Sequence, residues 1–409
     1  MTFHQKWSAA GRTALTLLTA LGTLAGAALA GAAPADAASW TEVAAGVEYR
    51  QYDLSAAAGV THAHVLSVDL TNSHVRLGLL YPGRVAARAA VSGLADGQGA
   101  VAGVNGDFFH ISETQHPGVE VTGASVGPAV ADGRVLKGAV PKGQRFGPGL
   151  PPGVGTGAVL GVGTDGLARL DTLSLQGTVT TAEQRLPLGG LNQYALPVGS
   201  IGAFTPEWGS ASRERAICGT DTDRGGPCSA NTYEVTLKGG RVVSVANSPG
   251  SGAVAAGSTV LVGREAGAER LREFTVGESV DVRYGLGSGS GRAYRFAIGG
   301  SPLLAGGLPL PGLNNGTSAV RTAVGVGDGG KRVFLFVLDG AVAYRRGLTV
   351  AEVAGALRDL GATEGFNLDG GGSSTLVARP AGQARVTVRN HPTGGAERRV
   401  PNGVGVFTR

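Results

Sequence analysis

The sequence has few cysteines, few aromatic residues and few charges of either sign. Of its 409 residues only two are cysteine, 5% are aromatic and 16% are charged. The net charge of +5 is too small for the basic surface that nucleic-acid binding requires, and a hydrophobic fraction of 42% is too large for a disordered chain. We therefore expect a globular protein that does not bind nucleic acid.

Long hydrophobic runs are absent from the sequence after its first 38 residues. Within them, Lys6 and Arg12 precede the apolar run Ala14–Ala30, and small residues follow it, which is the layout of a secretory signal peptide. The sequence thus predicts a signal peptide at 1–38 and a secreted mature chain at 39–409, extracellular or associated with the cell wall. No membrane span is expected after cleavage; a retained signal anchor is the alternative.

Only five of the 35 basic residues are lysine, which suggests a GC-rich bacterial genome.

Glycine, in contrast, is abundant, with 71 residues and no Gly-X-Y period. Such a content disfavours long helices and favours short strands joined by turns. β-branched runs bounded by turn residues predict strands at His64–Leu70, Val75–Leu80, Ala100–Asn105, Tyr233–Leu237, Arg241–Ala246, Val280–Tyr284 and Val333–Leu338. The predicted fold class is α+β, with mixed and antiparallel β-sheets and few helices.

Two helices are predicted from periodicity and capping signals. One covers Val85–Leu94, and the other covers Val350–Leu360, where Thr349 and Glu352 have the spacing of a capping box. A strand-like run precedes the second helix and the run Gly365–Leu368 follows it. We therefore expect one β-α-β unit near the C-terminus, with its two strands as parallel neighbours.

The two cysteines, Cys218 and Cys228, bracket a polar loop and predict a disulfide. A metal site is disfavoured there, because no nearby histidine or third cysteine completes a tetrahedral ligand set. The loop lies in the Gly- and Pro-rich segment 147–291, which we interpret as a β-rich insertion within one catalytic domain. A separate small binding domain is the alternative.

Three familiar motifs arise by chance in so glycine-rich a chain. GxGxxG occurs at Gly161 and again at Gly325, but each copy lies at an Asp-Gly turn before a strand-like run, so we expect hairpins rather than dinucleotide sites. GxSxG occurs around Ser125, yet a turn follows where a nucleophile elbow requires a helix. None of the three motifs therefore predicts the chemistry.

Polar residues at the ends of strand-like runs are more informative. One run ends in Asn105 and Asp107, followed by two phenylalanines. In another, Asn367 and Asp369 are two residues apart and so share a face of a strand. Gly370, Gly371 and Gly372 follow Asp369, and their backbone N–H groups suit an anion. Ser373 adds a hydroxyl group.

Two further segments have features of binding sites. The glycine pair before Ser301 would let the backbone approach a ligand closely. Arg321 leads an apolar strand, and its guanidinium group has the geometry to bind phosphate or carboxylate. Taken alone, each has an ordinary alternative, a bulged strand or a solvated arginine at a sheet edge.

Together these segments resemble the phosphodiester glycosidase family. The matching motifs are, in order, NGDFF at 105–109, GGSPLL at 299–304, RTAVG at 321–325, LDG at 338–340, NLDGGGSST at 367–375 and NGVGV at 402–406. NLDGGGSST is the most specific, and the others support it by their order and spacing. The sequence departs from the family pattern after Gly340, where many members have arginine and then serine. Arg345 or Arg346 is then a candidate for a phosphate contact.

The resemblance implies a hydrolase that cleaves the glycosidic C–O bond of a sugar-1-phosphate diester, releasing free sugar and a phosphomonoester. Asp369 is then the catalytic carboxylate, as nucleophile or as base for water, and Asp107 is the second catalytic candidate. Residues expected to bind the substrate or its phosphate are Arg321, Asn105, Asn367, Gly370, Gly371, Gly372, Ser373 and Ser301. No cofactor is required, although either aspartate could instead bind a divalent cation. The expected partner is a sugar phosphodiester or a phosphate-containing envelope glycan.

Two other functions remain open at this point. A non-catalytic glycan-binding protein of the cell envelope usually offers a platform of aromatic rings, and few are available here. A phosphodiesterase that cuts the P–O bond would normally need two metals held by histidine and aspartate. His62 and His64 share a face of a predicted strand, where we expect a solvated edge, and His110 and His116 flank the NGDFF loop and are candidates to line the site.

Overall fold

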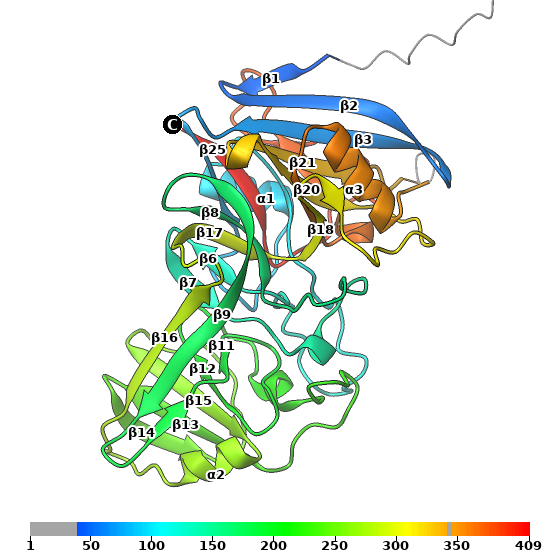
Figure 1. The fold of residues 1–409 in the computed structure, drawn as a ribbon. Helices are drawn as coiled ribbons and strands as arrows, with labels where there is room; N and C mark the ends of the chain where they lie inside the picture. The colour runs from blue at the N-terminus through cyan, green and yellow to red at the C-terminus, as the bar shows by residue number, and fades with distance from the viewer. Residues whose placement is uncertain (1–38, 342–345) are drawn as a thin grey trace, which may run out of the picture. The chain divides into compact units, whose positions relative to one another are not determined.

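The computed structural model describes residues 39–341 and 346–409 (Figure 1). The predicted signal peptide at 1–38 and Arg345 lie outside the described residues. Within the described part of the chain, no helix is long and apolar enough to cross a membrane.

The largest sheet has eight strands and leads into the RTAVG and NLDGGGSST segments; it also contains Ser301. Its strand order is β1 (Thr41–Ala44), β2 (Val47–Ala56), β3 (Gly59–Asp69), β21 (Arg332–Leu338), β20 (Thr322–Gly327), β22 (Glu364–Leu368), β18 (Ser301–Ala305) and β19 (Leu308–Pro309). All of its neighbouring strands are antiparallel. Strand β22 ends immediately before Asp369, and β20 begins immediately after Arg321.

A five-stranded sheet brings in the third site segment. Its order is β24 (Thr387–Val388), β23 (Leu376–Ala378), β5 (Ala102–Asn105), β25 (Gly403–Thr408) and β4 (Val75–Leu80). Strand β5 is buried along its whole length and ends at Asn105. Strand β23 follows the glycine run, and β25 begins within the NGVGV motif. Both strands pair with β5, so the C-terminal motifs pack around the NGDFF segment.

Two further sheets contain most of the remaining strands. The seven-stranded sheet consists of β10 (Arg185–Pro187), β9 (Ala168–Thr180), β8 (Ala158–Gly163), β17 (Tyr294–Gly299), β6 (Ala129–Ala131) and β7 (Arg134–Lys137), with β16 (Asp281–Ser288) paired to β9. The other sheet has five strands, β11 (Gly190–Leu191), β12 (Ile201–Phe204), β15 (Ser258–Arg264), β13 (Thr232–Lys238) and β14 (Arg241–Ala246). It lies entirely within 147–291, whereas β8 from that segment pairs with β17 outside it.

The predicted fold class is confirmed, because the described chain has mostly antiparallel sheets and few helices. The helices are α1 (Val91–Gln98), α2 (Ala266–Arg272) and α3 (Val350–Asp359), with short 3-10 turns η1 (Lys142–Gln144), η2 (Glu214–Ile217), η3 (Asp328–Gly330) and η4 (Gly371–Ser373). All seven predicted strands overlap observed ones. Both GxGxxG copies lie in hairpins, between β8 and β9 and between β20 and β21, as predicted.

Helix α3 begins with the predicted capping box. The Thr349 hydroxyl accepts the Glu352 N–H at 3.1 Å, and the Glu352 carboxylate accepts the Thr349 N–H at 2.7 Å. Val353 and Leu357 on its buried face pack with residues of the eight-stranded sheet, and Figure 1 shows the helix beside β18 and β20. Its burial against that sheet stabilises the strands that lead into the site.

Two details of the predicted secondary structure are wrong. The strands β21 and β22 on either side of α3 are not neighbours, because β20 lies between them and pairs antiparallel with both. The helix predicted over Val85–Leu94 begins only at Val91, since Val85 and Ala86 donate their N–H groups to the loop around Trp208. In both cases contacts with distant segments override the local pattern.

Candidate active site

The ends of strands β5, β20 and β22 meet around Asn105. Its side-chain N–H donates to the backbone carbonyl of Asp369 at 2.6 Å, and its Oδ1 accepts from Thr322 Oγ1 at 2.8 Å and from the Thr375 N–H at 3.1 Å. The Asp369 N–H donates in turn to the carbonyl of Gly106 at 2.9 Å. The structure thus brings the NGDFF, RTAVG and NLDGGGSST segments together, although Asn105 and Asp369 are 264 positions apart.

Asp369 combines partial burial with an unusual pKa. Burial raises the pKa of its carboxyl group to about 7, with a smaller contribution from the negative charge of Asp107. Hydrogen bonds from the Ser373 hydroxyl and the Gly370 N–H, together with the positive charge of Arg398, oppose the increase. A carboxyl group with this pKa exchanges a proton readily near neutral pH, as catalytic acids and bases must.

Asp107 is more deeply buried and its carboxylate is enclosed by backbone. It accepts the N–H groups of Phe108 at 2.8 Å and Gly127 at 2.6 Å, and its side chain is only 2% exposed. A Cβ atom at Gly299 would lie 2.7 Å from Asp107 Oδ2, so this member of the glycine pair makes room for the carboxylate. Burial raises the pKa of Asp107, and the positive charge of Lys137 opposes that increase.

Lys137 was missed by the sequence reasoning. It ends strand β7, is 1% exposed, and donates to the carbonyls of Val126, Gly127 and Gly138. Burial lowers the pKa of its ammonium group to about 7. A scarce lysine at the end of an apolar strand was the signal in the sequence, since lysines are seldom fully buried unless they are paired.

Arg321 lies beside the site, but its guanidinium group is already engaged. Its Nε and Nη2 donate to the carbonyls of Leu348 at 3.0 Å and Thr317 at 2.9 Å, and the residue is 7% exposed. The other arginine suggested from the sequence, Arg346, lies with its side-chain carbons against Gly59. Neither arrangement supplies a guanidinium fork aimed at Asp369.

Arg398 is the cation that lies next to Asp369. Its Nη1 lies 3.3 Å from Ser373 Oγ, and a Cβ atom at Gly372 would lie 2.2 Å from its Nη2. The absence of a side chain at Gly372 is therefore what admits the guanidinium group. Sequence reasoning passed over Arg398, although it stands four residues before the NGVGV motif at 402–406.

The glycine run has a tighter geometry than an open anion nest. The Gly371 N–H donates to the carbonyl of Val320 at 2.8 Å, and a Cβ atom at Gly370 would lie 2.5 Å from the same oxygen. Gly371 has a φ of 59°, which favours glycine. Two of the three predicted N–H donors are thus occupied, by Val320 and by the carboxylate of Asp369.

The remaining predicted side chains line the same strand ends. Ser301 and Asn367 are register partners on β18 and β22. Ser374 Oγ lies 3.1 Å from Thr322 Oγ1, whereas Asn367 Oδ1 and Thr375 Oγ1 are buried without a hydrogen-bond partner in the described chain. Buried polar atoms in native proteins usually have partners, so such exceptions point to a ligand or a bound water.

A cavity of about 520 Å³ opens beside Arg398. Two further arginines, Arg88 and Arg399, line it together with Thr122 and Ile111. The hydrogen bonds of the three guanidinium groups go to neutral oxygens of the described chain. Three guanidinium groups that line one cavity and donate no hydrogen bond to a carboxylate of the described chain form a surface suited to an anionic ligand.

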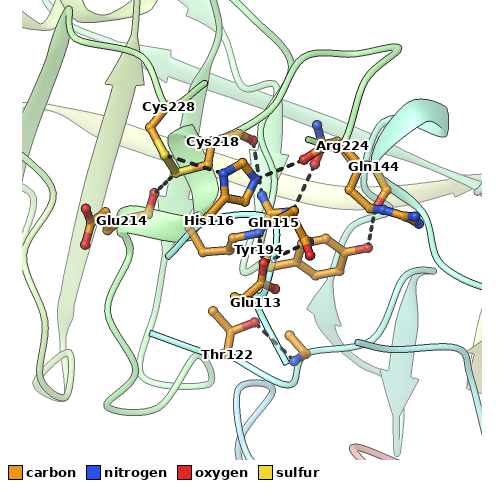
Figure 2. A network of polar contacts seen from close by, with 12 residues as sticks. Glu113, Gln115, His116, Thr122, Gln144, Tyr194, Glu214, Cys218, Arg224 and Cys228 are labelled. Atoms are coloured by element: carbon orange, nitrogen blue, oxygen red, sulfur yellow. Dashed lines mark hydrogen bonds and ion pairs between the residues drawn. A yellow bond between two sulfur atoms is a disulfide. The ribbon is translucent and has the colours of Figure 1, made fainter. Parts of the chain in front are cut away.

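His110 and His116, the two histidines that flank the NGDFF loop, have different surroundings. Figure 2 shows His116 beside the disulfide between Cys218 and Cys228, where its Nε2 lies 2.9 Å from the carbonyl of Arg224. His110 stacks on Phe146 with ring centroids 4.1 Å apart. The expectation that His116 lines the site is not supported by its contacts.

Two groups of described residues have the composition of a metal site. In one, His116 lies near the two cysteines, but the predicted disulfide is confirmed and uses both sulfur atoms. In the other, His62 and His64 face Asp339. The edge location predicted for His62 and His64 is wrong for His64, which is 1% exposed between β2 and β21.

Comparison with known proteins bears on the fold and on the C-terminal half. Residues 231–407 match the family model described as phosphodiester glycosidase. The search of curated proteins finds no match. Two solved structures share the fold: a hypothetical protein from Synechocystis (20% identity, TM-score 0.67) and a protein from Burkholderia pseudomallei named as one expected to be exported (23% identity, TM-score 0.65).

These likenesses cover most of this chain but less of the larger proteins. They span 89% of this chain and 62% of the Synechocystis protein, and 85% of this chain and 74% of the Burkholderia protein. The catalytic domain of zebrafish N-acetylglucosamine-1-phosphodiester alpha-N-acetylglucosaminidase is more remote, with 16% identity and a TM-score of 0.45 over 91% of this chain and 87% of that one.

The matched segment contains RTAVG and NLDGGGSST, with Asp369 and Arg398, whereas NGDFF lies before it. The resemblance predicted from the motifs is thereby confirmed: the segment 231–407 of this chain is similar to the phosphodiester glycosidase family.

Proposed function

We propose that this protein hydrolyses the glycosidic C–O bond of a sugar-1-phosphate diester and releases free sugar and a phosphomonoester. The observation that carries the proposal is Asp369, a carboxyl group with a pKa of about 7, whose neighbour Arg398 lines a cavity together with two further arginines. A proton-exchanging carboxyl group and a cationic surface are the two elements that this reaction needs.

Asp369 acts on the side of the sugar. In its deprotonated form it removes a proton from water as the water attacks the anomeric carbon, or it attacks that carbon directly. The oxocarbenium-like transition state gains from the negative charge in either case. The hydrogen bonds from Ser373 and Gly370 orient the carboxylate, and the bond from Asn105 to the backbone of Asp369 holds the loop in place.

The arginines act on the side of the leaving group. A phosphate monoester is a weak base, so its departure depends on cations and N–H donors more than on a strong general acid. Arg398 lies between Asp369 and the cavity, and Arg88 and Arg399 extend the same charge outward. Arg321, whose donors are taken by backbone carbonyls, orients the β20 end of the site instead.

Asp107 acts through Asp369 and does not contact the substrate itself. Its oxygens are bonded to backbone N–H groups, and it interacts electrostatically with both Lys137 and Asp369. Burial raises the pKa of Asp369 and the negative charge of Asp107 adds a smaller increase, while the positive charge of Lys137 stabilises the buried Asp107 carboxylate. We assign Asp107 a positioning role through Asp369.

The protein's location and organisation remain parts of the same proposal. A signal peptide at 1–38 and a disulfide between Cys218 and Cys228 both suit a secreted protein that meets phosphate-containing envelope glycans. We also retain residues 39–409 as one catalytic domain with a β-rich insertion at 147–291.

Cleavage with ¹⁸O-labelled water tests the bond that breaks. The purified protein is incubated with an α-N-acetylglucosamine-1-phosphate diester, and the phosphomonoester product is analysed by mass spectrometry, since its oxygens do not exchange with water. We expect no label in the phosphomonoester. Asp369→Asn should abolish turnover, and Asp281→Asn, a change at an exposed aspartate on β16, should leave it unchanged.

Each other outcome identifies a different function. Label in either phosphate-containing product would show attack at phosphorus, and the protein would be a phosphodiesterase. Failure to turn over any diester in a panel of sugars, combined with binding of envelope glycan to the intact protein, would favour the non-catalytic glycan-binding function.

A further inference from the structure

His62, His64 and Asp339 converge on one point. The two histidines are alternate residues of β3 and therefore share a face of the sheet. Asp339 follows the neighbouring strand β21, and its N–H donates to the carbonyl of His62 at 3.0 Å. One nitrogen of each histidine and one oxygen of Asp339 lie within 4.8 Å of one another.

The hydrogen bonds around a neutral His64 leave no proton between His64 Nε2 and Asp339 Oδ1. Tyr49 donates its single O–H proton to Gln51 Oε1 at 3.0 Å, so at 2.7 Å its oxygen must accept a proton from His64 Nδ1. The lone pair of a neutral His64 then lies on Nε2, which is 3.0 Å from Asp339 Oδ1. Two acceptors at this distance require a proton or a metal cation between them.

We propose that His62, His64 and Asp339 bind a divalent transition-metal ion of the zinc type, with water as the fourth ligand. His391 Nδ1 lies 3.1 Å from Asp339 Oδ2. His391 thus contacts the carboxylate oxygen that His64 does not contact, and it supports Asp339 from outside the ligand set. Two imidazole nitrogens, one carboxylate oxygen and a water form a tetrahedral set that zinc favours. Magnesium and calcium prefer sites made of oxygen atoms alone, so this donor set selects against them.

The surrounding contacts are those of a supported metal site. His62 Nδ1 lies 2.6 Å from Asp53 Oδ1, and His64 Nδ1 lies 2.7 Å from the Tyr49 hydroxyl, so a second group orients each ring. The backbone N–H of His391 donates to Asp339 Oδ1 at 2.5 Å. Partners of this kind fix the tautomer and orientation of metal-binding histidines.

The ion would connect the eight-stranded sheet to the glycine turn of the candidate active site. The carbonyl of His391 accepts the N–H groups of Gly340 and Ala341 at 2.7 and 3.0 Å. Two residues later, Thr393 Oγ1 donates to the carbonyl of Gly371 at 3.4 Å. Because the backbone N–H of His391 donates to Asp339 Oδ1, an ion bound at Asp339 would hold the segment that supports the turn after Asp369.

Metal binding is tested directly and without reference to activity. Tag-free protein is stripped with a chelator, dialysed against Zn²⁺ and analysed for zinc by elemental mass spectrometry; Co²⁺ is used for visible spectroscopy. We expect one ion per chain and the visible absorption bands of tetrahedral cobalt. His62→Ala should weaken binding by about 100-fold, and the control His74→Ala, at an exposed histidine, should not change it.

A second variant keeps the test valid if His62→Ala disturbs folding. Asp53→Asn changes only an exposed partner of His62 and should weaken zinc binding by about 10-fold. Absence of stoichiometric zinc in the folded wild-type protein would overturn the proposal, and so would equal binding by folded His62→Ala. Either result would mean that Tyr49 donates to His64 and that a proton alone joins His64 to Asp339. Neither outcome bears on whether the protein cleaves phosphodiesters.

Discussion

Two buried clusters of charged residues differ in how completely their polar atoms are paired. Around the disulfide, the guanidinium of Arg215 donates to Glu113 at 2.7 Å, to the Cys218 carbonyl at 3.1 Å and to Gln144 at 3.1 Å. Figure 2 shows Glu113, Gln144 and Tyr194 in this network. Around Asp369, by contrast, burial raises the pKa of the carboxyl group to about 7, and Asn367 Oδ1 and Thr375 Oγ1 have no hydrogen-bond partner among the described residues.

The difference separates a structural role from a chemical one. A buried ion pair with all of its hydrogen bonds made holds segments together, and nothing in it is left to react. A buried carboxyl group whose charged form is disfavoured has a proton that it can exchange with a substrate. We therefore expect mutations in the Arg215 network to affect stability and mutations around Asp369 to affect turnover.

The largest effect is expected from Asp369→Asn. The variant keeps the shape of the side chain and loses its proton exchange, so kcat should fall by about 10³-fold or more. Folding should persist, and at pH 8 the variant should be more stable than the wild type by about 1 kcal/mol, because it no longer buries a charge. Steady-state kinetics and urea unfolding measure the two quantities. Activity near the wild-type level would remove Asp369 from the mechanism.

The opposite pattern is expected from Glu113→Ala. This change leaves Arg215 buried without its carboxylate and should lower the free energy of unfolding by about 3–5 kcal/mol. The folded fraction should retain the wild-type kcat, because the network is built from other segments than the Asp369 cluster. Unfolding by denaturant, with activity measured at low temperature, separates the two effects. A large fall in kcat without loss of stability would mean that the Arg215 network contributes to catalysis and not to folding.

The pH dependence tests the same carboxyl group in the wild-type protein. Asp369 must be deprotonated to act as base or nucleophile, so kcat/KM should rise with pH and level off above about 7. Two pH units below that value the rate should be lower by about 100-fold. The raised pKa also means that the stability contributed by neutral Asp369 is present at low pH and lost as pH rises through about 7. A rate that is flat between pH 5 and 8 would contradict this assignment.

The sequence predicted the class of fold and the segments of the site better than their connections. Strand ends with Asn105 and with Asn367 and Asp369 were visible, because polar residues directly after buried runs are a local pattern. The adjacency of β20 to both β21 and β22 was not visible, since register between distant strands depends on the whole sheet. For the same reason α1 begins later than its local signal, at a point decided by contacts with the Trp208 loop.

The cationic part of the site was the least predictable from the sequence. Arg321 has the motif but donates to carbonyls, whereas Arg398 has no distinctive motif and lies next to Ser373. Which arginine faces an active site depends on the path of a loop and on a gap at Gly372, and neither is encoded in a short pattern. The sequence also predicts a solvated edge location for His64, whereas the pairing of β3 with β21 buries this residue.

The smallest effect is expected at the outer part of the arginine cavity. Arg88 lines the cavity beside Arg398 and Arg399, and burial lowers the pKa of its guanidinium group, with a smaller contribution from the positive charge of Arg399. Arg88→Gln should therefore raise KM for a phosphodiester by about tenfold, a loss typical of one charge-assisted contact, and leave kcat nearly unchanged. Arg283→Gln, at an exposed arginine on β16, is the matched control and should alter neither constant. An unchanged KM in Arg88→Gln would confine the anionic substrate to Arg398 and Arg399, nearer to Asp369.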